Sequence, residues 1–176
     1  HSVVGDSHAG EMTQYAITTA PIDGLTIAGS YYDFGQMGKQ DGRQKKEGGS
    51  LSGNYKVGSF SLGYGETRFA PNQVMGGAAA TDKTDYYANK LYSIGFAVND
   101  ALSVSFTEEE SEKNVKQKSV AAVTTRADVT MEIQTIDVAY TVGGATFSVS
   151  SSEATNDSYT KGDDSNEHIF AMSLAF

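Results

Sequence analysis

Apolar and polar residues alternate along much of this chain with a period of two residues. In the clearest case, Leu, Val and Phe alternate with Ser, Ser and Thr from Leu102 to Thr107. This period is that of a β-strand, whose successive side chains point to opposite faces. The pattern predicts an all-β fold with about nine strands of roughly 9 to 11 residues, the length of a tilted membrane-spanning strand.

The two faces of the predicted strands differ in an informative way. One face carries Leu, Ile, Val, Phe and Tyr, whereas the other carries mostly Ser, Thr, Gly and Ala, with Lys56 and Asp137 as occasional charges. A face so poor in charge suits the confined, wet interior of a membrane barrel, and the apolar face suits lipid. We therefore expect a transmembrane, antiparallel, up-and-down β-barrel.

The connections between the predicted strands alternate between tight and long. Hairpin turns, either glycine-rich or Asn-Asp, alternate with polar stretches of roughly a dozen residues or more. Short turns on one side and long loops on the other are typical of outer-membrane barrels, with the short side in the periplasm. The tight turns are expected at 23–24, 57–59, 99–100 and 143–144, and the long connections at about 36–49, 70–85, 108–128 and 155–166.

One predicted strand, 129–142, changes phase along its length. Met131 and Ile133 occupy odd positions, whereas Ile136, Val138 and Tyr140 occupy even ones. Two interpretations explain this change: a β-bulge near Thr135, or a strand that extends above the membrane.

Composition and charge narrow the range of functions. The chain has 19 Gly, 10 Tyr, 8 Phe, 2 Pro and no Cys, so disulfides, thiolate metal sites and a cysteine nucleophile are excluded. A formal charge of −9 argues against a nucleic-acid partner, whose phosphates favour a basic surface.

No catalytic or cofactor site is predicted. His1, His8 and His168 are far apart and fit no metal-ligand or triad spacing, so we expect neither an enzyme nor a bound metal or cofactor. Four acidic residues lack the spacing of a calcium loop and are interpreted as a solvated surface loop. They are Asp157, Asp163, Asp164 and Glu167.

The last segment, 168–176, ends the chain on an aromatic residue. Phe170, Met172, Leu174 and Phe176 share one face of it. This segment resembles the C-terminal assembly signal of outer-membrane barrels, and the whole chain resembles the C-terminal half of a Gram-negative general porin. The resemblance implies a homotrimeric, water-filled channel that is inserted into the outer membrane by the barrel-assembly machinery.

Strand parity refines this expectation. Bacterial single-chain barrels have an even number of strands, with both termini in the periplasm. About nine strands then form the C-terminal part of a barrel of about sixteen strands, with a companion N-terminal fragment of the same barrel. We expect residues 1–176 to form a single barrel domain, in which 1–10 are an extracellular loop or cut end and 11–176 supply the strands.

The predicted function is passive diffusion of small hydrophilic solutes and ions. The lining side chains hydrate and weakly steer solutes rather than react with them. Outer-membrane lipid and lipopolysaccharide are the expected surroundings. A candidate contact for lipopolysaccharide phosphate is the basic cluster of Lys39, Arg43, Lys45 and Lys46. The predicted pore-lining residues are Lys56, Ser61, Ser103, Ser105, Thr107, Asp137, Thr141 and Ser148.

Two other functional classes stay open. A small, filled outer-membrane barrel with an adhesive or structural role requires about eight strands that close within this chain. In that barrel the same small residues pack a filled lumen. A soluble, ligand-binding barrel requires the apolar face to point inward.

Overall fold

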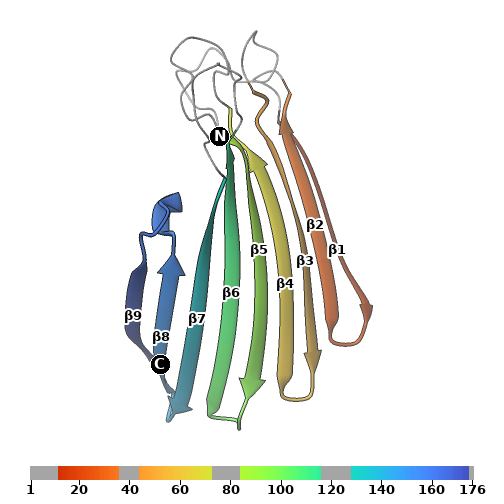
Figure 1. Cartoon of the computed structure of the whole chain (residues 1–176). Coiled ribbons are helices and arrows are strands. Elements are labelled where there is room, and N and C mark those ends of the chain that lie inside the picture. Colours follow the sequence, from red (N-terminus) through yellow and green to blue (C-terminus); the bar gives the residue numbers. More distant parts are fainter. Residues whose placement is uncertain (1–11, 36–43, 73–83, 116–127, 175–176) are drawn as a thin grey trace.

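The computed structural model describes residues 12–35, 44–72, 84–115 and 128–174. The expected loop at 1–10 and the terminal Phe176 lie outside these residues. The described chain forms one antiparallel sheet of nine strands in sequence order (Figure 1). The strands are β1 (Met12–Ile22), β2 (Leu25–Phe34), β3 (Glu47–Val57), β4 (Phe60–Ala70), β5 (Thr84–Ala97), β6 (Leu102–Val115), β7 (Val129–Val142), β8 (Ala145–Thr155) and β9 (Ser165–Leu174).

The topology is up-and-down, because every strand pairs with its neighbours in sequence. The all-β fold and the expected nine strands are confirmed. Within the described residues the sheet is not closed: β1 pairs with β2 alone and β9 with β8 alone. Closure by about eight strands inside this chain, which the small-barrel alternative required, is therefore not the observed architecture.

The predicted tight turns are confirmed, and they lie together at the lower end of the sheet in Figure 1. Gly24 turns the chain between β1 and β2 with a φ of 76°, and a Cβ there would lie 2.2 Å from the Lys56 carbonyl oxygen. The β5–β6 turn uses a side chain instead: Asn99 Oδ1 accepts hydrogen bonds from the backbone N–H groups of Ala101 and Leu102. Both turns depend on local residues that can be recognised in the sequence.

One expected long connection is shorter than the sequence suggested. Strand β6 continues to Val115, so the acidic run that begins at Glu108 lies in a strand and not in a loop. Cross-strand pairing explains the difference, because Lys90 of β5 lies directly opposite Glu110. The β8–β9 connection contains a short 3₁₀ turn, η1 (Asp157–Tyr159). No helix in the described part of the chain is long and apolar enough to cross a membrane.

Strand β7 has no bulge near Thr135. Its pairing with β6 runs without interruption from Val129 to Tyr140, and its pairing with β8 runs from Glu132 to Val142. The bulge interpretation is therefore wrong. Because the register is regular, the phase change at Met131 means that apolar side chains move to the other face of the sheet near the long connections.

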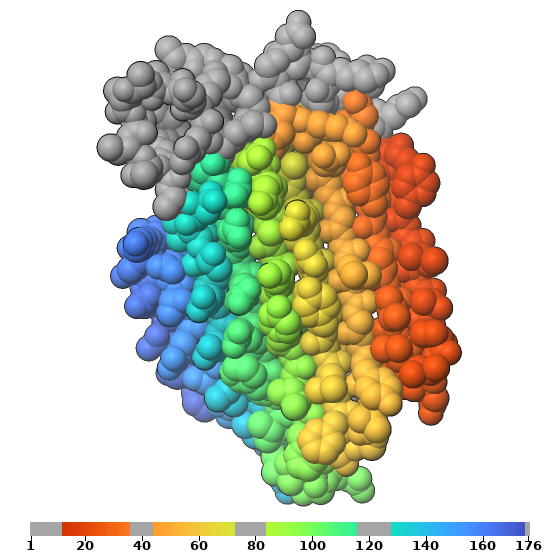
Figure 2. Space-filling view, turned by 45° about the vertical axis from the view of Figure 1, so that its right-hand side comes forward, coloured from red at the N-terminus to blue at the C-terminus, as the bar shows by residue number. Residues whose placement is uncertain are grey.

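The two faces of the sheet differ in exposure as well as in chemistry. We call the face that carries Ile136, Val138 and Tyr140 the apolar face, and the opposite one, which carries Asp137, the hydroxyl face. In β7 the apolar side chains are exposed, with Ile136 at 52% and Tyr140 at 47%, whereas Thr135, Asp137 and Ala139 on the hydroxyl face are half-buried. A sheet that curves toward the hydroxyl face crowds it in this way. Figure 2 shows one face of the curved sheet, continuous from the red β1 to the blue C-terminal strands.

We predict that two glycines of β3 respond oppositely to substitution. A Cβ on Gly48 would lie 2.6 Å from the Tyr32 ring and 2.9 Å from the Arg68 carbonyl oxygen, whereas a Cβ on Gly53 meets nothing within 4 Å. Overpacking should lower the unfolding free energy of Gly48→Ala by about 1–3 kcal/mol. Gly53→Ala should be neutral or stabilising by about 0.5 kcal/mol, because Ala restricts the unfolded chain. Urea titration in detergent measures both, and equal losses would contradict the described packing.

Candidate functional site

All the predicted pore-lining residues project from the hydroxyl face. They come from five strands of the sheet, β3, β4, β6, β7 and β8, and the cross-strand registers place them on one side. The residues that the sequence pattern predicted therefore share one face of the sheet. These residues are Lys56, Ser61, Ser103, Ser105, Thr107, Asp137, Thr141 and Ser148.

Hydroxyl groups on this face pair across neighbouring strands. Thr141 Oγ1 lies 2.9 Å from Thr146 Oγ1, and Thr135 Oγ1 lies 2.8 Å from Ser152 Oγ. Each hydroxyl can donate one hydrogen bond and accept two, so such pairs keep further capacity for water. The surface is suited to holding a hydration layer.

Charge is sparse on the hydroxyl face where these residues lie. Lys56 of β3 is exposed and lies directly opposite Ser61. Asp137 of β7 lies opposite Ser105, whose Oγ donates to its Oδ2 at 3.5 Å. The cation and the carboxylate are thus separated by the strands between β3 and β7. These two charges therefore do not form a compact cluster.

The predicted assembly segment lies on the apolar face of the edge strand β9. Phe170, Met172 and Leu174 are 78%, 59% and 51% exposed. The fourth predicted member, Phe176, lies outside the described residues. The alternation that predicted these positions also placed them correctly on one face.

The two faces exchange character toward the long connections. On the hydroxyl face, Phe69 and Tyr87 stack with ring centroids 6.5 Å apart. On the opposite face, Glu66, Lys90 and Glu110 lie in one cross-strand row. The lower part of the sheet is therefore apolar on one side, and the part near the long connections is apolar on the other.

No sequence pattern predicts the polar cluster around Ser111 on the hydroxyl face near the long connections. Ser111 of β6 is only 3% exposed, although it is polar. Its Oγ donates to Asn89 Oδ1 at 2.5 Å and lies 2.7 Å from the hydroxyl oxygen of Tyr159. Tyr159 belongs to η1 and is 48 residues away along the chain. No local sequence pattern predicts this contact, because it depends on how the β8–β9 connection folds.

The β8–β9 connection, residues 156–164, is a compact turn held by its own polar groups. Asn156, Ser158 and Tyr159 have φ values of 53°, 54° and 58°, in the left-handed region. Asp157 Oδ2 accepts a hydrogen bond from the Ser165 hydroxyl at 2.6 Å, and Asp157 Oδ1 accepts one from Ser158 at 3.2 Å. These bonds hold the pKa of the Asp157 carboxyl below its usual range, the Ser165 bond most strongly.

Asp164, another acidic residue of this region, has a structural partner too. Asp164 Oδ1 accepts a hydrogen bond from the backbone N–H of Asn156 at 3.2 Å. Among the residues that the structure describes, no group of three or more His, Cys, Asp and Glu side chains is placed to hold a metal ion. The carboxylates of Asp157 and Asp164 thus act as acceptors within the turn.

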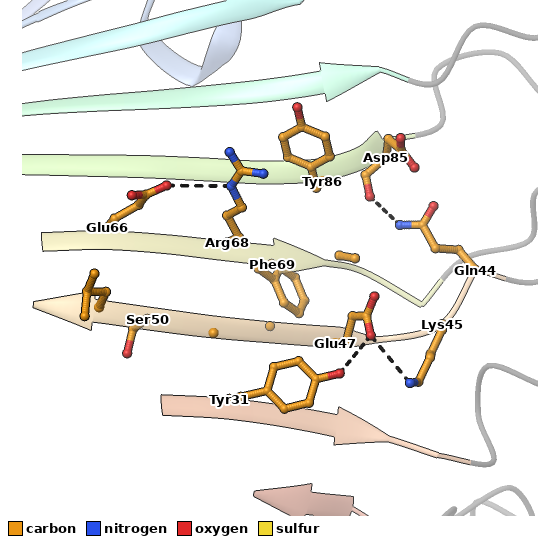
Figure 3. Close-up of a pocket in the computed structure, with 14 residues that line it drawn as sticks. Tyr31, Gln44, Lys45, Glu47, Ser50, Glu66, Arg68, Phe69, Asp85 and Tyr86 are labelled. Atoms are coloured by element: carbon orange, nitrogen blue, oxygen red, sulfur yellow. Dashed lines mark hydrogen bonds and ion pairs between the residues drawn. The ribbon is translucent and has the colours of Figure 1, made fainter. Parts of the chain in front are cut away.

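A shallow groove of about 840 Å³ opens on the charged end of the apolar face (Figure 3). Gly49 of β3 leaves its floor free of side chains, and Tyr31 and Arg68 rise from the neighbouring strands. The Tyr31 hydroxyl donates to Glu47 Oε2 at 3.0 Å, and Arg68 Nε lies 3.7 Å from Glu66 Oε1. The groove is amphipathic, but its charges are largely paired with each other.

Two members of the expected basic cluster, Lys39 and Arg43, lie outside the described residues, and the two described members have partners. Lys45 Nζ lies 2.5 Å from Asp33 Oδ2 and 3.5 Å from Glu47 Oε2. The bond to Asp33 raises the pKa of Lys45. Lys46 Nζ lies 4.3 Å from the centroid of the Phe34 ring. Neither lysine is presented as an unpaired cation, which weakens the prediction of a phosphate contact at these two positions.

We predict that the Ser165 hydroxyl sets the acidity of Asp157. In the wild type, an NMR titration should give a carboxyl pKa below the ordinary 3.8. A lowered folded pKa stabilises the connection above the ordinary value, and this stabilisation disappears as the pH falls through the folded pKa. Ser165→Ala should raise the pKa toward 3.8. An unchanged pKa in Ser165→Ala would show that the bond is absent in solution.

Comparison with known proteins adds no family to this description. The chain matches no protein-family model, and no curated protein matches it closely. Its resemblance to general porins therefore depends on the residues themselves: the alternating strands, the turn pattern and the apolar terminal strand.

Proposed function

We propose that this chain is part of an outer-membrane diffusion channel of the general porin type. In this proposal the apolar face contacts lipid, and the hydroxyl face lines a water-filled lumen through which small hydrophilic solutes and ions pass. The chain carries out no covalent chemistry in this role.

The exposure of the apolar side chains carries the proposal. Among the described residues no hydrophobic side chain is buried, while Phe60, Leu62, Ile94 and Phe96 on adjacent strands are 39–49% exposed. Water disfavours a contiguous apolar surface by roughly 25 cal/mol per Å², and soluble monomers rarely expose patches beyond a few hundred Å². Lipid is the solvent that makes such a surface favourable.

The placement of the aromatic residues supports the same environment. Tyr64 and Tyr92 lie side by side, with ring centroids 5.4 Å apart, at the row where the apolar face gives way to the charged row of Glu66 and Lys90. Tyrosine rings at such a boundary suit a membrane interface, because one end of the ring is apolar and the other polar. The charged end of this face then meets headgroups and lipopolysaccharide.

The unpaired edges of β1 and β9 support a barrel larger than the sheet described. Unpaired backbone groups are unfavourable in hydrocarbon, so a membrane sheet must close on itself. We propose closure with further strands of the same barrel, about sixteen in all, as in porins. A homotrimer in the outer membrane, inserted by the barrel-assembly machinery, belongs to the same proposal.

A filled barrel with a structural or adhesive role is the second candidate. The stacked Phe69 and Tyr87 favour it locally, because they place apolar rings on the hydroxyl face. The small side chains around Ser105 and Ser148 favour a water-filled lumen instead, since they leave space that a filled barrel would need to pack. Conductance separates the two candidates.

The proposal predicts stepwise ohmic conductance in a planar lipid bilayer. The whole natural protein, purified in detergent with every segment of the barrel retained, should give long-lived openings, in groups of three for a trimer. Insertion without conductance would favour the filled barrel. Failure to enter lipid vesicles would overturn the membrane proposal.

Two adjacent residues of β7 test the assignment of the faces. Val138 lies on the apolar face and Ala139 on the hydroxyl face, opposite Ser103. Val138→Lys should make folding into a bilayer less favourable by about 2–4 kcal/mol, the penalty of a lysine facing the middle of the lipid. Ala139→Lys should fold normally and shift the reversal potential in a salt gradient toward anions. The opposite pair of results would show that the faces are reversed.

A further inference from the structure

The β8–β9 connection, residues 156–164, folds over the hydroxyl face instead of extending away from the sheet. Its residue Tyr159 contacts Tyr87 of β5 and Ser111 of β6, and both of these side chains project from the hydroxyl face. From β8 to β5 are three strand spacings, about 14 Å along the sheet at the usual spacing. The connection therefore crosses in front of β7 and β6 to make these contacts.

A chain of hydrogen bonds fixes the end of Tyr159. Asn89 Nδ2 donates to Thr67 Oγ1 at 2.9 Å, and Asn89 Oδ1 accepts the Ser111 hydroxyl proton. Because Ser111 has only one proton to donate, the Tyr159 hydroxyl must donate to Ser111 Oγ, which lies 2.7 Å away. The chain thus links the connection to β6, β5 and β4. Its direction is set by the donors and acceptors available.

Ring contacts hold the body of the same side chain. The centroids of the Tyr159 and Tyr87 rings are 5.6 Å apart, and Tyr87 in turn stacks on Phe69. Lys113 Nζ lies 5.9 Å from the centroid of the Tyr159 ring. Aromatic pairs of this geometry contribute beyond the area that they bury. Tyr159 is therefore held both at its hydroxyl and along its ring.

The base of the connection is attached to the sheet as well. Asn156 Nδ2 donates to the Thr130 carbonyl oxygen of β7 at 2.9 Å, and Asn156 Oδ1 accepts the backbone N–H of Gly162 at 3.0 Å. With Asn156 and Tyr159 both fixed, the connection has one anchor at the loop-side end of β7 and another across the hydroxyl face. Such a double attachment keeps the connection in the folded-in position.

We infer that the 156–164 connection constricts the loop-side end of the channel and that Tyr159 sets the width of the passage there. This inference rests on the proposed function, since a constriction has meaning only if solutes pass along the hydroxyl face. Tyr159 is a residue that determines which solutes fit. Thr67, Asn89 and Ser111 position it.

The decisive comparison is between the wild type, Tyr159→Ala, Tyr159→Phe and Thr160→Ala. Tyr159→Ala removes the ring and the hydroxyl, and Tyr159→Phe removes the hydroxyl alone. Thr160 is the neighbouring residue, and its side chain is exposed, so Thr160→Ala is the matched control. The assembled full protein is studied in planar bilayers, with neutral polymers of graded size as probes of the passage.

We expect about a twofold rise in single-channel conductance for Tyr159→Ala, together with entry of larger polymers, because the narrowest point dominates the resistance of a pore. Tyr159→Phe should give a smaller rise, with noisier openings, and Thr160→Ala should match the wild type. A wild-type channel whose conductance and polymer limit are unchanged in Tyr159→Ala would overturn the inference and leave the proposed function intact. Absence of conductance in every variant after insertion would overturn the proposed function and the inference with it.

Tryptic cleavage gives a second readout that does not depend on conduction. Lys161 lies in the connection, and a protease needs its target segment unfolded, so cleavage follows the population of the undocked state. Cleavage after Lys161 in intact vesicles should be about tenfold faster in Tyr159→Ala than in the wild type or Thr160→Ala, since the anchor is lost. Equal cleavage rates in all three would show that Tyr159 does not hold the connection in place.

Discussion

Uninterrupted pairing between neighbouring strands is the constraint on which the rest of this structure depends. From β2 to β9, nearly every residue of a strand has a fixed partner on the strand before it, and within the described residues the register shifts only near Ile22 and Thr84. A slip of one residue would move every side chain of a strand to the other face. The registers therefore keep the apolar face and the hydroxyl face separate across the whole width of the sheet.

The same constraint explains how the faces can exchange character without a defect. Strand β7 keeps its pairing through Thr135, and the chemistry alone changes, from Ile136 on one face to Ile133 on the other. The change is shared by the partners of β7, because Glu110 of β6 lies opposite Glu132. Two directly opposed carboxylates are tolerated where water or counter-ions can reach them. The exchange is thus a property of whole rows of residues and not of one strand.

The fold was largely predictable from the sequence because its determinants are local. A period of two marks each strand, and Gly24 or Asn99 marks a turn within a few residues. The same alternation placed the expected lining residues on one face. Pattern could not predict contacts made by connections: the burial of Ser111 depends on Tyr159, which reaches it from another part of the chain. The extent of β6 was missed for a related reason, since its acidic residues are polar enough to suggest a loop until the opposite strand is known.

The exchange of character between the faces also gives the sheet a preferred position relative to an apolar layer that has water on both sides. Shifting the sheet along its strands in one direction would bring Glu66 and Lys90 into the apolar layer. Shifting it in the opposite direction would move Leu62 and Ile94 out of that layer. Both shifts cost free energy, so the position of the charged row opposes movement of the sheet along its strands. In a lipid bilayer, the sheet would therefore settle with this row of charges at the boundary between hydrocarbon and headgroups.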